Sequence, residues 1–310
     1  MLLTPRRRAG FTLVELMVGI VLVGLVGLTL MRVVVSSQRI SQAQTAQADM
    51  QANVRTAALM LPAELREIGY DFDAAGVVRT DLVDAQATSL RTRVMRGWGV
   101  ICGNYDVNDI RVRLPLVAYR NPTPADSFLL FLENEHNRGD DDQWVPFHAA
   151  VVDPDSDCGT SADRALRLST LTGDVLFGGA AVDLTTGMPL QSRILNGGPI
   201  RFFEVMEYGL YEAGGRAWLG ARSLTAGEAA YEPVIGPLRA GNGMSLRYLD
   251  RDEAVVPPND PTRFGDIRMI ELTLRAETGA GITGPGGFGA RGIQGDTLVT
   301  RVAVRNLLRP

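Results

Sequence analysis

The sequence predicts an α+β protein, in which a long N-terminal helix packs on an antiparallel β-rich globular domain. Three observations predict this class. Residues 11–31 form an almost unbroken apolar run, apolar residues then recur at helical spacing as far as residue 68, and short apolar or alternating segments follow from residue 71 onward. With 310 residues, 45% of them hydrophobic, the chain is long enough to bury a core beyond its N-terminal helix.

The apolar run predicts a single membrane-spanning helix. At a rise of about 1.5 Å per residue, residues 11–31 make a rod of about 31 Å, which matches the hydrocarbon core of a bilayer. We place the membrane half of the helix at residues 11–35. Arg6, Arg7 and Arg8 precede it, and by the positive-inside rule they stay in the cytoplasm, so the body lies on the other side. The alternative is a signal peptide or signal anchor, but a secretory signal has a shorter apolar region of about 7 to 15 residues.

Residues 36–70 are expected to continue the helix as its amphipathic half. Pro62 either kinks the helix or starts a new helical piece, and Gly69 is a plausible stop. A parallel coiled coil is the alternative use of the apolar stripe, but the stripe is short and rich in alanine, which favours packing on the protein's own sheet. The stripe consists of Ile40, Ala43, Met50, Val54, Ala58, Leu61, Leu65 and Ile68.

Glu15 is an anomaly within the predicted membrane helix. A charged residue near the centre of a span costs about 2.5 to 3.5 kcal/mol on insertion scales, so it is expected to have a partner. No basic residue lies within one helical turn of it. Cleavage after Gly10 would create a cation at the α-amino group of Phe11, and a neighbouring subunit would supply another. At about 4 Å and an effective dielectric constant near 20, such a pair attracts by about 4 kcal/mol.

The segment Arg6-Arg7-Arg8-Ala9-Gly10-Phe11-Thr12-Leu13-Val14-Glu15-Leu16 resembles the N-terminus of type IV prepilins and of the pseudopilins of type II secretion. The resemblance implies that residues 1–10 are a leader, which prepilin peptidase removes after Gly10. It also implies N-methylation of Phe11 and a subunit-docking role for Glu15. The protein would wait among the lipids of the inner membrane before it joins a pilus or pseudopilus.

A second resemblance narrows the expected function. Residues 65–70, Leu-Arg-Glu-Ile-Gly-Tyr, are similar to the end of the first helix in PilW-type minor pilins. This similarity implies a minor pilin without enzymatic activity or cofactor, whose partners are other pilin subunits bound through the N-terminal helix. The alternatives are a J-type pseudopilin and a signal-anchored β-domain binding protein that does not polymerise.

The body, residues 71–310, is expected to consist of β-strands. Residues 127–132 predict a buried strand, 200–211 a hairpin-like pair or one long strand, and 270–275 and 301–305 half-buried strands. Between the last two, residues 279–295 are rich in glycine and predict a loop.

Cys102 and Cys158 are the only cysteines. Two cysteines in an oxidising compartment usually pair, and two alone do not close a zinc site, so we expect a disulfide. Two buried free thiols are the alternative. Many major pilins close a loop near the C-terminus with a disulfide, whereas both cysteines here lie in the first half of the body.

The remaining polar clusters predict little chemistry. Acidic residues gather at 133–142 and 153–157, and a calcium-stabilised loop is one interpretation, but the spacing does not fit an EF-hand and a solvated loop fits better. His136 and His148 have no nucleophile motif in their flanks. Loss of the leader takes the formal charge from −4 to about −7, which argues against nucleic acid as a partner.

Overall fold

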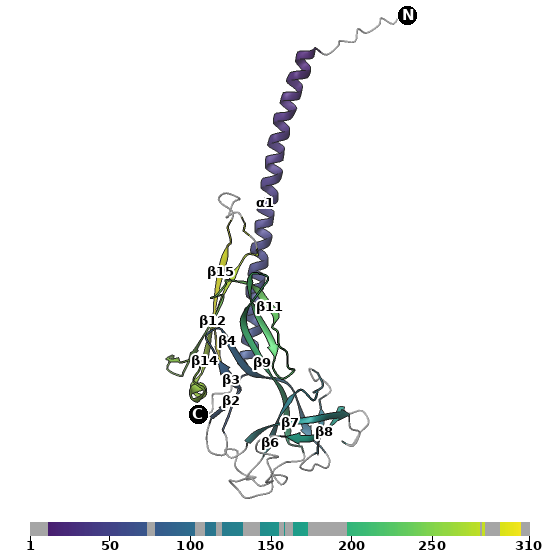
Figure 1. The fold of residues 1–310 in the computed structure, drawn as a ribbon, viewed down its shortest axis with the longest axis vertical. Helices are drawn as coiled ribbons and strands as arrows, with labels where there is room; N and C mark the ends of the chain where they lie inside the picture. Colours follow the sequence, from purple (N-terminus) through teal and green to yellow (C-terminus); the bar gives the residue numbers. More distant parts are fainter. Residues whose placement is uncertain are drawn as a thin grey trace, which may run out of the picture. The chain divides into compact units, whose positions relative to one another are not determined.

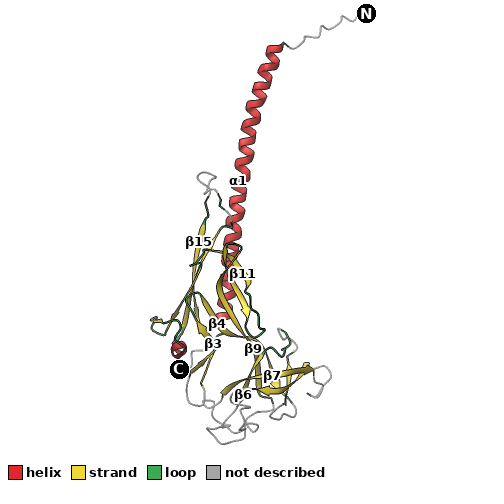
Figure 2. Ribbon diagram, in the orientation of Figure 1, coloured by secondary structure: helices red, strands yellow, loops and turns green. Residues whose placement is uncertain are grey.

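The computed structural model describes one long helix followed by strands (Figure 2). The residues described are 12–72, 78–102, 109–115, 120–132, 143–154, 158, 164–172, 197–279, 281–282 and 292–304. The helix is α1 (Leu13–Arg66), and a 3₁₀ helix, η2, spans Pro261–Asp266. The strands are β1 (Tyr70–Phe72), β2 (Val78–Thr80), β3 (Leu82–Ala85), β4 (Ser89–Ile101), β5 (Asp109–Leu114), β6 (Ser127–Leu132), β7 (Gln143–Pro154), β8 (Arg164–Thr172), β9 (Pro199–Ala213), β10 (Arg216–Ser223), β11 (Glu232–Leu238), β12 (Met244–Leu249), β13 (Val255–Val256), β14 (Met269–Glu277) and β15 (Gly295–Ala303).

The chain divides into two compact units. The first contains residues 1–52 and 277–295, and the second contains residues 53–276 and 296–310. In the first unit, the N–H of Thr278 donates to the carbonyl of Gln294 at 2.8 Å, and Ile282 forms a bridge with Gly292. The described residues of the predicted glycine-rich loop are therefore paired across a hairpin, while residues 283–291 lie outside the described part of the chain.

Helix α1 runs without interruption through Pro62, which the sequence predicts as a kink or a new start. Proline lacks an N–H and clashes with the carbonyl four residues earlier, so it is costly inside a helix. Only four helical residues follow Pro62, so a proline at this position affects few hydrogen bonds of the helix, and the helix continues through it. The helix ends at Arg66, and the N–H of Gly69 donates to Asp81 Oδ2 at 2.9 Å.

The last turns of α1 bury an apolar face within the second unit. The Nδ2 of Asn53 donates to the carbonyl of Gly236 at 2.9 Å, which fixes the helix against the strands (Figure 1). Ala57 is buried, whereas the predicted Ala58 is only half-buried, so the face is one residue from the expected position there. Burial of a valine, leucine or isoleucine contributes about 1.5 to 3 kcal/mol for each side chain. The buried residues in the last turns of the helix are Val54, Ala57, Leu61, Pro62 and Leu65, and Ile68 just after the helix is buried as well.

Strands β4 and β9 form the centre of the sheet, and all their pairings are antiparallel. Ser89 faces Gly209 and Val100 faces Pro199 at the two ends of the ladder. The other edge of the C-terminal half of β9 pairs with β10, and the sheet continues in the order β11, β14, β12 and β13, with β15 also on β14. The predicted strand at 200–211 is thus one long strand, and its length lets it pair with β4 from Pro199 to Gly209 and, on its other edge, with β6 and then β10.

The N-terminal half of β9 takes part in a closed barrel. Strand β9 pairs with β6, β6 with β7, β7 with β8, β8 with β5, and β5 with β4, which pairs with β9 again. These six antiparallel strands therefore form a ring without an open edge, which removes the unpaired backbone groups that an open sheet exposes. The interior is apolar and contains Ile101, Ile110, Val112, Leu114, Phe128, Leu130, Leu132, Phe147, Ala149, Leu166, Leu168, Ile200 and Phe202.

A bulge in β4 marks the place where the sheet becomes the barrel. The register with β9 shifts between Met95 and Gly97, so Arg96 is the extra residue. Just beyond the bulge, a Cβ on Gly97 would collide with the ring of Phe202 inside the barrel. Glycine is required there because the ring occupies the space that a side chain would need.

The fold class predicted from sequence is confirmed. The structure contains a long N-terminal apolar helix followed by a globular domain rich in antiparallel β-sheet. The buried strand predicted at Ser127–Leu132 is β6, and its inward residues belong to the barrel core.

Candidate functional site

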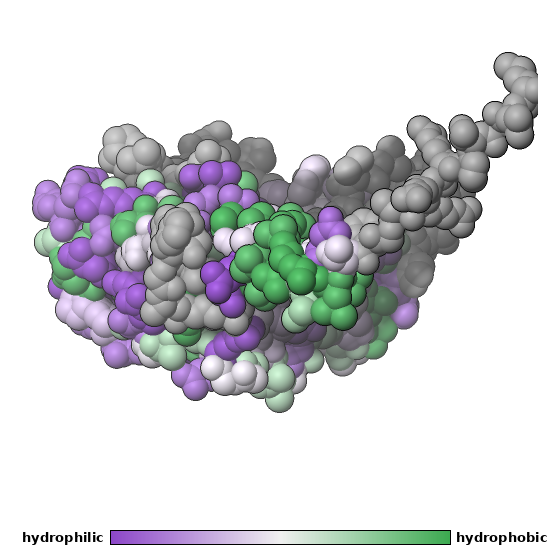
Figure 3. Space-filling view, turned by 90° about the horizontal axis from the view of Figure 1, so that it is seen from above, coloured by the Kyte–Doolittle hydropathy of each residue, from purple (hydrophilic) through white to green (hydrophobic). Residues whose placement is uncertain are grey.

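The N-terminal part of α1 exposes its apolar side chains on all sides. Its large apolar residues from Leu13 to Val35 are exposed by 37% or more. Among the described residues, α1 is the one helix that is long and apolar enough to cross a membrane, with a mean hydropathy of 2.5 over its most apolar 18 residues. Figure 3 shows hydrophobic residues gathered in one area of the surface, with hydrophilic residues prominent elsewhere. An apolar surface of this extent requires lipid or other protein to cover it.

Thr12 and Glu15 form a capping box at the start of this helix. Glu15 Oε2 accepts hydrogen bonds from the backbone N–H of Thr12 at 3.1 Å and from its hydroxyl at 3.0 Å. In return, the Thr12 hydroxyl oxygen accepts from the Glu15 N–H at 3.3 Å. The two side chains thus satisfy backbone donors that the first turn leaves free. The Glu15 carboxylate therefore has partners within its own chain.

This cap was readable from the sequence. A threonine three residues before a glutamate, followed by an apolar run, is the signature of a capping box. Our expectation for Glu15 concerned the α-amino group of Phe11, in its own chain and in a neighbouring subunit, and did not include Thr12. Gly10 and Phe11, the predicted cleavage and methylation positions, lie outside the described residues, as do Arg6, Arg7 and Arg8, so their roles stay predictions.

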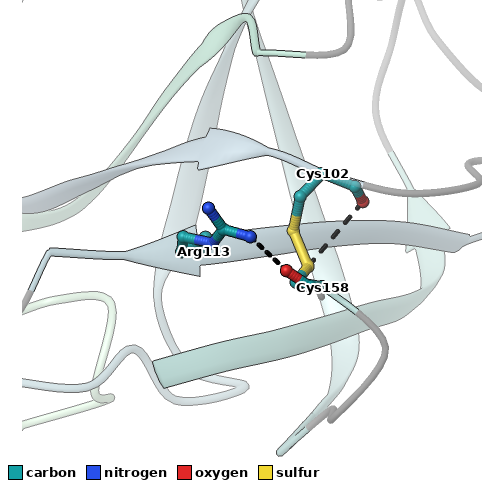
Figure 4. The surroundings of a disulfide bond; sticks show 3 residues. All are labelled: Cys102, Arg113 and Cys158. Carbon is teal, nitrogen blue, oxygen red and sulfur yellow. Dashed lines mark hydrogen bonds between the residues drawn. A yellow bond between two sulfur atoms is a disulfide. The ribbon is translucent and has the colours of Figure 1, made fainter. Parts of the chain in front are cut away.

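A disulfide joins Cys102, which follows β4, to Cys158, which lies between β7 and β8 (Figure 4). The two Cα atoms are 5.5 Å apart, both side chains are buried, and Ala165 packs with them. The guanidinium of Arg113 on β5 donates to the carbonyl of Cys158. The bond therefore ties the end of β4 to the connection between two other barrel strands, 56 residues further along the chain.

The calcium hypothesis lies largely outside the described residues. Residues 133–142 and 155–157, which contain most of the acidic groups concerned, are not among them. In the part of the chain that the structure describes, no three His, Cys, Asp or Glu residues gather closely enough to hold a metal ion. The metal interpretation of these two segments therefore stays a hypothesis.

The structure places His148 beside Ser127, its partner across β6 and β7. The hydroxyl oxygen lies 3.3 Å from Nδ1 and 3.2 Å from Nε2 of the ring. A general base takes a proton along the direction of one nitrogen lone pair, and an oxygen equally distant from both nitrogens lies on neither direction. The neighbouring Asp126 accepts from Arg120 and Thr123 and is not directed at the histidine. This arrangement fits a surface cross-strand pair better than a nucleophile and its base.

A chain of ion pairs fixes the junction between the helix, the sheet and the barrel. Arg96, the bulge residue, contacts the carboxylate of Glu204 on β9 and lies 3.7 Å from Glu64 on α1. Burial raises the pKa of the Glu64 carboxyl, and the nearby Arg96 offsets this only in part. Burial also acts to raise the pKa of Asp126, but hydrogen bonds from Arg120 and Thr123 outweigh it and hold the pKa below its usual value. Glu64 therefore keeps its proton to a higher pH than an exposed glutamate does, and Asp126 loses its proton at a lower pH than an exposed aspartate does.

The N-terminal segment matches a known protein motif. Residues 5–31 match the prokaryotic N-terminal methylation motif. Together with the exposed apolar helix and the β-rich domain, this match supports a type IV pilin-like or pseudopilin protein, a structural class and not an enzymatic one. Comparison with curated proteins and with solved structures gave no match, so the particular member of this class is a matter for proposal.

Proposed function

We propose that the protein is a minor pilin of a type IV pilus. Prepilin peptidase cuts between Gly10 and Phe11 and methylates the new N-terminus. The mature protein spans the inner membrane through residues 11–35 with its body outside the cytoplasm, and it enters the filament when its apolar helix packs against the helices of other subunits. The methylation motif over residues 5–31 carries this proposal.

The exposure of the N-terminal helix supports assembly by helix packing. Leu13 is 75% exposed and Val23 is 73% exposed, so the apolar surface surrounds the helix and is not confined to one stripe. A helix that is apolar on every side is stable in lipid or inside a bundle of helices. The same surface therefore serves the membrane-bound state and the assembled state.

The capping box explains how Glu15 is tolerated before assembly. Within lipid, an unpaired carboxylate is costly, but here it accepts hydrogen bonds from the N–H and hydroxyl of Thr12. On assembly, the α-amino group of Phe11 in a neighbouring subunit replaces or joins these donors. A charged donor binds a carboxylate about twice as strongly as a neutral donor does, so the exchange favours the filament.

The first test is the intact mass and N-terminal sequence of the protein from native membranes. A mature start at Phe11 with one added methyl group is expected. An uncut N-terminus, or a start elsewhere, would exclude prepilin processing and favour a signal-anchored β-domain protein.

The second test replaces Glu15 with alanine and follows the protein in filaments sheared from cells. Processing is expected to continue, because Gly10 and Phe11 are unchanged, while incorporation into filaments fails. Leu16→Ala is the matched control, since Leu16 is also exposed near the start of the helix at 58%. Normal incorporation of Glu15→Ala would show that the carboxylate does not dock subunits. Loss of protein secretion in a deletion strain that still makes surface pili would indicate a J-type pseudopilin in place of a minor pilin.

A further inference from the structure

The outer face of the barrel presents a group of aromatic side chains around one arginine. Trp98 on β4 faces Arg201 on β9 across the ladder. Phe131 on β6 faces Trp144 on β7, and their ring centroids are 5.3 Å apart in an edge-to-face arrangement. Side chains alternate between the two faces of a strand, and the neighbours of Phe131 and Arg201 belong to the barrel core, so these two residues point outward. Trp98 and Trp144 are paired directly with them across the ladders and therefore lie on the same outer face. We name this group, Trp98, Phe131, Trp144 and Arg201, the Trp98 patch.

Trp98 is unusually exposed for its size. It is 54% exposed, whereas the other two tryptophans, Trp144 and Trp218, are half-buried. Within the described residues, the side chain of Trp98 makes no hydrogen bond or ring contact. A tryptophan side chain that is exposed in this way contributes little buried apolar surface to the stability of the fold. Its apolar surface is available to a partner.

Arg201 is held in place without neutralising its charge. Its guanidinium lies 4.3 Å from the centroid of the Trp144 ring, a distance typical of a stacked cation–π pair. Stacking uses the flat face of the guanidinium and leaves its N–H donors, which lie in the plane of the group, free to bind. Within the described residues, no carboxylate lies within 4.0 Å of the Arg201 guanidinium and no group accepts a hydrogen bond from it. In the part of the chain that the structure describes, the site therefore presents an oriented cation without an acidic partner.

We propose that the Trp98 patch is a docking surface for another protein, which places a carboxylate on Arg201 and an apolar side chain against Trp98. Tryptophan and arginine dominate the binding energy of protein interfaces, where anchoring aromatic residues surround paired charges. The patch lies on the outside of the barrel, whereas small-molecule sites are concave. A formal charge of −4 for the whole chain opposes the approach of a polyanion such as nucleic acid, while a single carboxylate on a partner meets one exposed arginine.

The test is photo-crosslinking in the native host with the full-length protein. Trp98→p-benzoylphenylalanine keeps an aromatic group at the centre of the patch and forms covalent bonds with whatever covers it. We expect a discrete adduct, and mass spectrometry of its crosslinked peptide should identify a segment of another protein that contains Asp or Glu beside an apolar residue. Adding Arg201→Glu should lower the adduct yield about tenfold or more, because it places like charges together. Arg201→Lys should give an intermediate yield, since lysine keeps the charge but not the planar donors.

The matched control carries the crosslinker at Val255 on β13, which is 52% exposed and belongs to another part of the sheet. Adducts from this position should not depend on Arg201. The melting temperature of each variant should match that of the wild type, because both substituted side chains are exposed. The proposal is overturned by no adduct at position 98, by an adduct whose yield does not change with Arg201→Glu, or by an adduct to a polysaccharide or nucleic acid. The proposed role as a pilin is tested separately by the N-terminal mass, so either can fail alone.

Discussion

Replacing Cys102 and Cys158 together with alanine is expected to destabilise the barrel by about 4 kcal/mol. The disulfide closes a segment with a sequence separation of 56 residues. In the chain-entropy model, the cross-link lowers the entropy of the unfolded chain by about 14 cal/mol/K for a segment of this length, which is about 4 kcal/mol at 25 °C. Domains are usually stable by only about 5 to 15 kcal/mol, so this loss is a large share of the total.

Urea unfolding of the purified full-length protein in detergent measures this change. With a slope of about 2 to 3 kcal/mol/M, the midpoint should fall by about 1.3 to 2 M. The tryptophans separate the two parts of the second unit, because Trp98 and Trp144 lie on barrel strands while Trp218 lies on β10. A variant with phenylalanine at 98 and 144 reports on β10 alone, and its midpoint should fall less than that of the barrel signal.

Two controls make the result decisive. Wild-type protein treated with reductant should unfold at the same urea concentration as the double alanine variant. The single variants Cys102→Ala and Cys158→Ala should match it as well, because either one removes the bond. A change below about 1 kcal/mol in the barrel signal would refute the reasoning, since it would mean that the cross-link does not restrict the unfolded chain.

Three further predictions concern single side chains. Glu204→Gln should cost about 3 kcal/mol of unfolding free energy, because it leaves Arg96 partly buried without its closest carboxylate, and urea unfolding at pH 7 measures it. Glu64→Gln should have a different effect, which depends on pH. The pKa of Glu64 is raised in the folded state, so its neutral form contributes stability below about pH 4.5, and this stability is lost as the pH rises through the folded pKa. The variant should therefore be as stable as the wild type in acid and at least as stable at pH 7. A fall in stability for Glu64→Gln at pH 7 comparable to that for Glu204→Gln would contradict this sign. Thr12→Val should speed hydrogen exchange of the Glu15 amide in micelles, because the first turn of the helix loses about 1 kcal/mol of stability with its cap. Thr12→Ser keeps the hydroxyl and should leave the exchange rate unchanged. Equal exchange in both variants would show that the hydroxyl does not cap the helix.

The sequence predicts the elements of this fold because their signals are local. A continuous apolar run marks the exposed apolar half of α1, helical spacing marks its buried face, and residues 127–132 predict a buried strand, which the structure shows as β6. Even here the prediction differs from the structure by one residue, since Ala57 is buried and Ala58 is not. The apolar pattern distinguishes poorly between two adjacent alanines, because both side chains are small.

Long-range pairing explains what the sequence does not predict. The closure of the barrel depends on β4 meeting β9, whose paired residues Trp98 and Arg201 lie about a hundred positions apart. An alternating pattern says which face of a strand is apolar but not which strand lies beside it. For the same reason the sequence does not predict the bulge at Arg96, since an extra residue in one strand is defined only relative to the partner strand.

The sequence by itself determined the long apolar helix, its anomalous acid Glu15, the methylation motif and the β-rich class of the body, because periodicity, length and motif spacing act over a few turns of chain. The tertiary structure decided that six strands close into a barrel, that the disulfide ties β4 to the β7–β8 connection, and that Trp98 and Arg201 share an exposed face. These features arise from contacts between distant segments, whose geometry is set by register and twist and not by the local order of residues.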